Sequence, residues 1–175
     1  MKKILALSLV LLVLAGCSSE TYKTGLGMVT SVGSSKAATA EANGTAQADV
    51  TAAAVTVDSK GKIVSISVDV VQAKVAFAAD GSLATDLGAE FKTKKELKED
   101  YGMLKASPIG KEWYQQMQAF EEWATGKTVA EVTGMATKVN GDHPAVPDVA
   151  ELASTCTMDV SAFLAAIEKA AANVK

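Results

Sequence analysis

The strongest constraint on the fold is a run of alternating apolar and polar residues at 63–70. In this run the apolar members Val64, Ile66, Val68 and Val70 alternate with Ser65, Ser67 and Asp69. Alternation with a period of two is typical of a strand that has one buried face. The turn sequence Asp58-Ser59-Lys60-Gly61 separates this run from a valine-rich segment at 50–57, and Gly61 suits the positive φ of a hairpin loop. These features predict an antiparallel β-hairpin.

Two further strands are expected beside this hairpin. A strand over 74–78 is predicted to end at the turn residues Asp80-Gly81. Residues 25–32 are rich enough in β-branched side chains to form a first strand, with their glycines marking a turn or bulge. The sheet is therefore expected to be antiparallel and formed by neighbours in sequence.

After Thr85 the pattern indicates helices and loops. Thr93 is predicted to cap a short helix that ends near Gly102, and Thr128 is predicted to cap another over 129–133. The strongest helix is expected over 111–125, and Gly126 follows it as the C-cap. One face of that helix carries Trp113, Met117, Phe120 and Ala124.

The last third of the chain is predicted to contain a loop, a strand and a helix. Residues 140–148 are expected to be an exposed loop, and 154–158 a short strand. Asp159 is predicted to cap the terminal helix. The inner face of that helix is expected to carry Phe163, Leu164, Ile167, Ala171 and Val174. The predicted fold class is α+β, with a small antiparallel sheet packed against three to four helices.

The amino-terminal segment resembles a bacterial lipobox. Lys2 and Lys3 precede a short apolar run that ends in Leu14-Ala15-Gly16-Cys17. The resemblance implies a signal peptide over 1–16, cleavage before Cys17, diacylation of the Cys17 sulfur and acylation of the new amino terminus. Residues 17–46 are then the lipid anchor and a flexible tether that includes the first strand, and 47–175 are a single α+β domain. The alternative is an ordinary cleaved signal in which Cys17 is an incidental thiol.

The lipobox predicts a protein held on a cell membrane by acyl chains such as palmitate, on its extracytoplasmic face. No second apolar run is long enough to cross a bilayer. The formal charge of −3 becomes −5 when Lys2 and Lys3 leave with the leader. An acidic chain without a basic cluster in its sequence argues against nucleic acid and against electrostatic docking on anionic lipid. The N-terminal lipid is thus the expected membrane contact.

Residues suited to catalysis or metal binding are few. His143 is the only histidine, which argues against a histidine-rich metal site, and no metal is expected. With Cys17 acylated, Cys156 has no partner for a disulfide, and burial as a small apolar residue is its favoured state. A thiol enzyme with Cys156 as nucleophile and His143 as base stays an alternative. The main expectation is that the protein binds a ligand and is not an enzyme.

Four aromatic residues on the 111–125 helix form the best sign of a ligand. They are Trp113, Tyr114, Phe120 and Trp123. Trp113 and Phe120 fit the buried stripe, whereas Tyr114 and Trp123 point elsewhere and are free for a partner. Rings at such spacing could also stack on a planar cofactor.

Several segments resemble bacterial lipoproteins with an FMN-binding domain. The strand-turn-strand units at 57–64 and 77–83 look like this family, as does the stretch Leu152-Ala153-Ser154-Thr155-Cys156-Thr157 before an alanine-rich helix. The family motif is Ser-Gly-Ala-Thr, then any residue, then Thr or Ser, and Thr155 stands at its FMN-accepting position. Leu152 replaces the motif's Ser, which counts against covalent attachment. Residues 111–114 and 126–129 also look like a subgroup of small clostridial-type surface lipoproteins.

The resemblance implies an FMN-binding or electron-carrier-type module that meets a redox partner protein. Ser154, Thr155 and Thr157 would hold the phosphate, and Trp123 or Tyr114 would cover the ring. Partial positive charge at the start of the terminal helix favours a phosphate there, whereas Asp159 opposes it. The alternative function is a flavin-free surface lipoprotein that binds a protein or a small solute.

Overall fold

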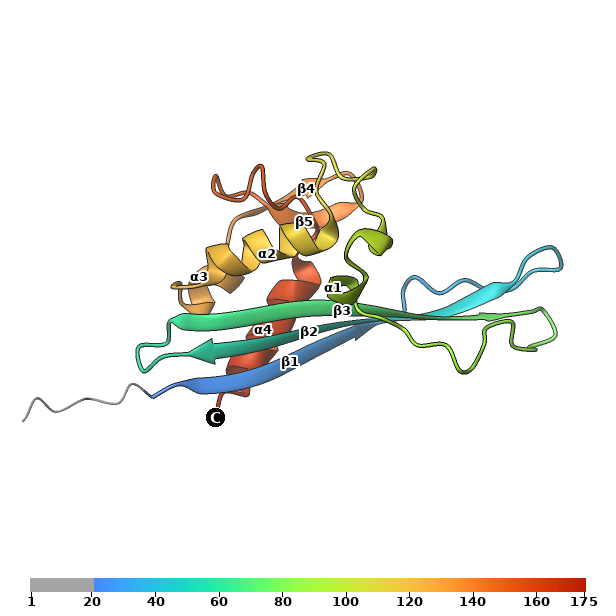
Figure 1. Cartoon of the computed structure of the whole chain (residues 1–175), viewed down its shortest axis with the longest axis horizontal. Coiled ribbons are helices and arrows are strands. Elements are labelled where there is room, and N and C mark those ends of the chain that lie inside the picture. Colours follow the sequence, from blue (N-terminus) through green and yellow to red (C-terminus); the bar gives the residue numbers. More distant parts are fainter. Residues whose placement is uncertain (1–20) are drawn as a thin grey trace, which may run out of the picture.

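The computed structural model describes residues 21–175, so the expected leader and Cys17 lie outside the described residues. Three long strands form an antiparallel meander: β1 (Lys23–Ser31), β2 (Gly44–Val57) and β3 (Ile63–Phe77) (Figure 1). The 57–64 hairpin is confirmed, with Gly61 at φ 76° in its turn. The first strand expected within 17–46 is β1, which pairs with β2 over its whole length.

The start of β3 differs from the simple alternating pattern. Thr56 pairs with Ser65 and Val57 with Ile63, so Val64 is an extra residue that forms a bulge. Ile63 is therefore buried and Val64 is 40% exposed, although the alternation placed Val64 on the inner face. The separate strand predicted over 74–78 is the last part of the continuous strand β3.

The short helices begin where the sequence predicts. In α1 (Lys94–Leu97) and α3 (Val129–Thr133), the cap residues Thr93 and Thr128 each form a capping box with a glutamate three residues later. A 3₁₀ turn, η1 (Lys98–Tyr101), follows α1 and ends at Gly102. The helix α2 (Trp113–Ala124) buries the predicted stripe, with Met117 and Phe120 fully enclosed.

The terminal helix α4 (Ser161–Ala172) packs on β1 and β2. Its buried residues are Phe163, Ala166, Ile167 and Ala170, so the prediction that Ala171 and Val174 complete the inner face is wrong. The helix lies so close to the sheet that its small residues face Gly25 and Gly27. A Cβ on Gly27 would lie 2.1 Å from the carbonyl oxygen of Ala166.

Two predictions for the segment between α3 and α4 are wrong. Residues 140–148 are not an irregular loop, since β4 (Thr137–Asn140) and β5 (His143–Pro147) form a second hairpin around Gly141, at φ 58°. The strand predicted over 154–158 is instead a series of turns that leads into α4. Asn-Gly-Asp is itself a hairpin turn signal, which the two prolines of β5 obscured.

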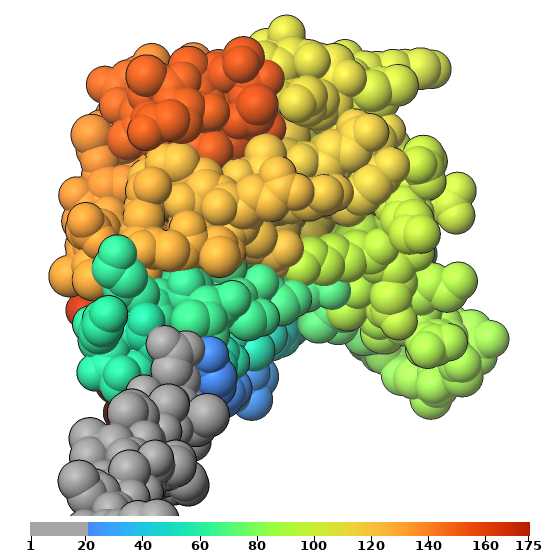
Figure 2. Space-filling view, turned by 60° about the vertical axis from the view of Figure 1, so that its left-hand side comes forward, coloured from blue at the N-terminus to red at the C-terminus, as the bar shows by residue number. Residues whose placement is uncertain are grey.

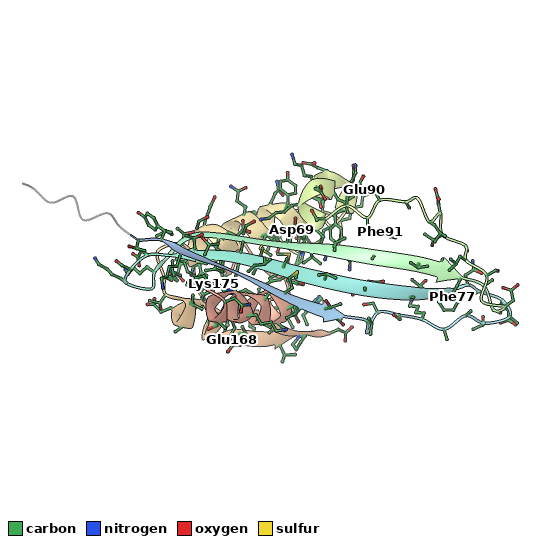
Figure 3. The ribbon with its side chains drawn as sticks, turned by 90° about the horizontal axis from the view of Figure 1, so that it is seen from below. Asp69, Phe77, Glu90, Phe91, Glu168 and Lys175 are labelled. Atoms are coloured by element: carbon green, nitrogen blue, oxygen red, sulfur yellow. The ribbon has the colours of Figure 1, made fainter. Side chains whose placement is uncertain are left out.

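The helices cover one face of the three-stranded sheet. Seen from below, the strands lie in front of the helices, and Phe77 and Lys175 lie toward opposite ends of the molecule (Figure 3). The ends of β2 and β3 extend past β1 as a two-stranded arm (Figure 1). In the part of the chain that the structure describes, no helix has the length and apolar character needed to cross a membrane.

Candidate functional site

A cleft of about 470 Å³ opens between the sheet and the helices. Its floor is the middle of β2 and β3, where Thr51 pairs with Val70. One wall comes from α1, the 101–108 segment and α2, and the other from β5 and the 157–163 segment at the start of α4. Cofactor sites in proteins commonly have volumes of roughly 300–1,000 Å³.

Aromatic rings and one lysine line much of this cleft. Trp113 is 2% exposed and meets Phe163 edge to face, with ring centroids 6.0 Å apart. The Lys94 ammonium lies 4.5 Å from the centroid of the Tyr101 ring and 5.4 Å from that of Trp113. The cleft thus offers apolar rings beside one ammonium, a combination suited to a planar ligand, and the carboxylates of Asp49 and Asp159 also line it.

Gln116 joins the two walls of the cleft. Its side chain is fully buried, and its amide nitrogen donates to the hydroxyl of Ser107 at 3.0 Å and to the carbonyl of Lys111 at 3.1 Å. Its amide oxygen accepts a hydrogen bond from the backbone N–H of Thr157 at 2.9 Å. A buried amide with all these partners holds both segments in one geometry.

Glu112 fixes the segment before α2. Its buried carboxylate accepts backbone hydrogen bonds from Met103 at 2.9 Å and from Leu104 at 3.1 Å. Its own backbone N–H donates to Gln115 at 2.9 Å. Hydrogen bonds to a charged acceptor are among the stronger ones, so this wall is anchored to the start of α2.

Asp49 lies on the floor at the cleft's edge. Its carboxylate accepts hydrogen bonds from Gln47 at 2.7 Å, Gln72 at 2.9 Å and Ser34 at 3.1 Å. Burial alone would raise its pKa, but these hydrogen bonds and the charge of Lys94 outweigh burial and lower the pKa of Asp49. Asp49 is therefore ionised at neutral pH and offsets part of the Lys94 charge.

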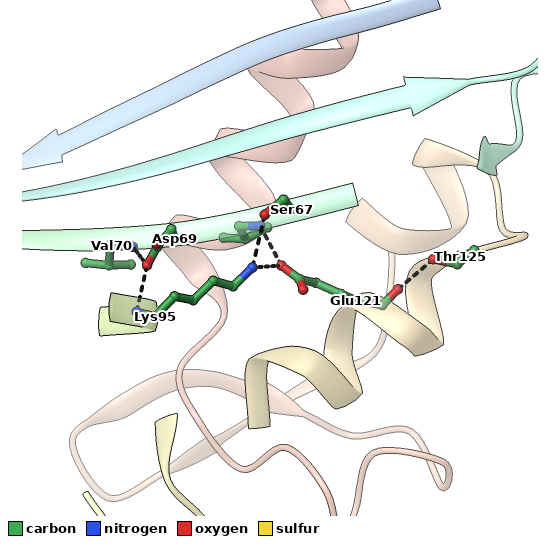
Figure 4. Close-up of polar contacts among 7 residues, drawn as sticks. Ser67, Asp69, Val70, Lys95, Glu121 and Thr125 are labelled. Atoms are coloured by element: carbon green, nitrogen blue, oxygen red, sulfur yellow. Dashed lines mark hydrogen bonds and ion pairs between the residues drawn. The ribbon is translucent and has the colours of Figure 1, made fainter. Parts of the chain in front are cut away.

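A second polar cluster attaches α1 and α2 to the edge of β3 (Figure 4). One Glu121 carboxylate oxygen accepts the Val68 backbone N–H and the Lys95 ammonium, both at 2.6 Å. Lys95 also donates to the Ser67 hydroxyl at 3.0 Å. This cluster satisfies an edge N–H of the sheet and positions α1, which carries Lys94.

The structure brings one of the five predicted cofactor-binding residues to the cleft, namely Thr157. Ser154 is exposed, and the Thr155 hydroxyl donates to the carbonyl of Glu151 at 3.2 Å, outside the cleft lining. Tyr114 donates its hydroxyl to Glu99 at 2.7 Å and borders a different depression.

Trp123 also lies outside the cleft lining, beside Lys127, whose ammonium is 4.8 Å from the indole ring. Its buried indole N–H has no hydrogen-bond acceptor among the described residues. The aromatic residues that do line the cleft are Tyr101, Trp113 and Phe163. Gln116 is a site residue that the sequence patterns did not predict. The signal that could have identified it is its position as a polar residue next to the buried stripe of α2.

Val160 is the N-cap of α4, so the prediction that Asp159 caps this helix is wrong, although the Asp159 carboxylate accepts hydrogen bonds at the start of the helix. One carboxylate oxygen accepts hydrogen bonds from the Ser161 backbone N–H at 2.8 Å and from its hydroxyl at 2.6 Å. The other accepts from the Ala145 N–H at 3.4 Å. The carboxylate thus already occupies the helix end where a phosphate would otherwise bind.

Cys156 is fully buried, which agrees with its predicted role as a small apolar residue. Burial raises the pKa of its thiol from 9.0 to about 11.

We expect alkylation of Cys156 at pH 8 to be about 100-fold slower in the native protein than in urea, as measured by mass spectrometry. The buried protonated thiol contributes its full stability below pH 9 and loses it as pH rises toward 11. Equal native and unfolded rates would contradict this environment.

Among residues 21–175, no group of three or more His, Cys, Asp or Glu residues is arranged to hold a metal ion. No family model matches the chain, and no solved structure matches it. It is similar to a chlorophenol reductase from Desulfitobacterium hafniense, with 40% identity over 95 residues. The match covers 48% of this chain and 29% of that protein, so the chain spans less than a third of the relative's length.

Proposed function

We propose that this chain is a lipid-anchored, extracytoplasmic redox protein whose α+β domain binds FMN reversibly in the aromatic cleft. The observation that carries the proposal is the combination of Trp113, Tyr101 and the Lys94 ammonium in one cleft of about 470 Å³. Bound FMN would supply one- or two-electron transfer. The protein would act as a carrier between partner proteins and not as an enzyme.

The residues of the cleft fit the two ends of FMN. Tyr101 is half-buried and provides ring surface for a flat ring system, Trp113 and Phe163 line the cleft at 2% and 5% exposure, and the Thr157 hydroxyl provides a polar contact. Among the described residues that line the cleft, Lys94 is the one with a permanent positive charge, which suits the phosphate. Gln116 and Glu112 hold the walls that carry these groups.

The position of Thr155 favours reversible over covalent attachment. Its hydroxyl donates to the carbonyl of Glu151, whereas the neighbouring Thr157 lines the cleft. The similarity to a protein called a chlorophenol reductase supports a redox-associated role. The second candidate function is a flavin-free lipoprotein that binds a small solute in the same cleft.

Titration with FMN and with riboflavin tests this proposal. We expect the mature protein to quench the fluorescence of both flavins on binding. Lys94→Gln should weaken FMN binding by about tenfold and leave riboflavin binding unchanged, because only FMN has a phosphate to pair with the ammonium. Lys92→Gln removes the same charge from an exposed residue outside the cleft and is the matched control.

Three outcomes would count against the proposal in different ways. Failure to bind either flavin would contradict it and leave the flavin-free alternative. Equal loss of FMN and riboflavin affinity in Lys94→Gln would contradict the role of Lys94 as the phosphate contact. A flavin-sized increase in the intact mass of the denatured chain, absent from Thr155→Ala, would contradict reversible attachment.

A further inference from the structure

The fold gathers five lysines at one end of the molecule, which we call the basic end: Lys23, Lys60, Lys62, Lys127 and Lys175. Lys23 pairs with Val57, next to the hairpin turn that contains Lys60 and Lys62. Lys62 forms an isolated antiparallel β-bridge with Thr128. The backbone N–H of Lys175 donates to the carbonyl of Thr24. Figure 2 shows the hairpin turn, the start of β1 and the α2–α3 junction together at this end.

The charge of the basic end differs from that of the rest of the domain. Lys23, Lys60, Lys62 and Lys175 are exposed, and Lys127 is half-buried. None of the five forms an ion pair within 4.0 Å with another described residue. The acidic groups at this end include Asp58, Glu131 and the terminal carboxylate, whereas the rest of the described chain is acidic overall.

The basic end is also the end closest to the expected lipid anchor. Five residues separate Cys17 from Lys23, and a fully extended segment of that length spans at most about 20 Å. The structure thus shortens the expected tether, because the sheet already begins at Lys23. A lipid on Cys17 would keep Lys23 and its neighbours near the bilayer surface.

We infer that the basic end docks on the anionic phospholipid headgroups of the membrane that holds the anchor. This inference rests on the lipid anchoring in the proposed function but not on flavin binding. Each lysine near an anionic surface strengthens the association by about fivefold. The absence of a basic cluster from the sequence does not exclude such docking, since β-pairing brings distant lysines together.

Docking of this end would set the orientation of the cleft. Asp49 lies at the edge of the cleft and pairs with Ser31 at the end of β1. Ser31 is eight residues from Lys23, which pairs with Val57 at the start of β1. At about 3.3 Å per residue, that separation is roughly 26 Å along the strand. The cleft would therefore lie away from the bilayer, where a soluble redox partner can reach it.

The test uses the full lipidated protein on vesicles with a headgroup-linked quencher. A fluorophore is placed on Ser59→Cys in the hairpin turn of the basic end, or on Ser82→Cys at the tip of the arm. Vesicles contain phosphatidylcholine alone, or phosphatidylcholine with phosphatidylglycerol. We expect quenching of the Ser59 label to be at least threefold greater on the anionic vesicles, and quenching of the Ser82 label to be equal on both.

Charge-removing variants identify the lysines responsible. Combined Lys60→Gln, Lys62→Gln and Lys127→Gln should reduce quenching of the Ser59 label to the neutral-vesicle level. The matched control, Lys36→Gln, Lys74→Gln and Lys92→Gln, removes the same charge near the arm and should leave quenching unchanged. Equal quenching on both vesicle types would overturn the docking. Failure to co-sediment with neutral vesicles would overturn the anchor, while flavin binding would be judged separately by titration.

Discussion

Replacement of Gly27 by alanine is expected to lower the free energy of unfolding by about 3 kcal/mol or more. The new Cβ would lie 2.1 Å from the carbonyl oxygen of Ala166 and 2.3 Å from the backbone nitrogen of Ala170. Both are backbone atoms of α4, so no side chain can rotate to make room. The helix would have to move away from β1 and disturb the burial of Phe163 and Ile167.

Urea denaturation followed by circular dichroism measures this effect through the midpoint at unchanged slope. Gly33→Ala is the matched control, because a Cβ there would meet only the Ser31 hydroxyl at 3.4 Å, an ordinary contact. The control should change stability by no more than about 0.5 kcal/mol. Equal midpoints for Gly27→Ala and Gly33→Ala would show that α4 does not pack as closely on β1 as described.

Replacement of Gln116 by leucine is expected to lower the free energy of unfolding by about 3 kcal/mol. It is also expected to weaken FMN binding by at least tenfold. The substitution leaves the half-buried Thr157 N–H without its acceptor and removes the hydrogen bonds to Ser107 and Lys111. Each unsatisfied buried polar group costs about 1–3 kcal/mol. The two cleft walls would separate, and the Thr157 contact to a ligand would be lost with them.

Gln118→Leu is the matched control for this variant. Gln118 lies on the same helix but is exposed, and its amide contacts only the exposed Glu122. We expect it to bind FMN as the unchanged protein does, in the same fluorescence titration. If Gln116→Leu lost stability but kept its FMN affinity, the flavin would bind elsewhere than in this cleft.

Local signals in the sequence predicted most of the secondary structure. Thr93 and Thr128 were identifiable as caps because each precedes a glutamate by three residues, a pattern that acts within one turn. The stripe of Met117 and Phe120 on α2 follows from helical periodicity. The two long strands β2 and β3 follow from alternation and a turn with Gly61.

The remaining features depend on tertiary contacts that local patterns do not contain. Ala166 and Ala170 face the sheet because Gly25 and Gly27 admit a close helix, and this pairing is visible only when both elements are placed. The bulge at Val64 depends on how β3 registers with β2. The same applies to the cleft, since Lys94, Gln116 and Thr157 come from three separate segments.

The visible absorbance spectrum of the purified protein, recorded after incubation with excess FMN and removal of free ligand, tests the central claim most directly. The account predicts a yellow protein with equimolar bound flavin, which is released when the chain is denatured. A colourless protein that stays free of flavin under these conditions would contradict FMN binding in the cleft.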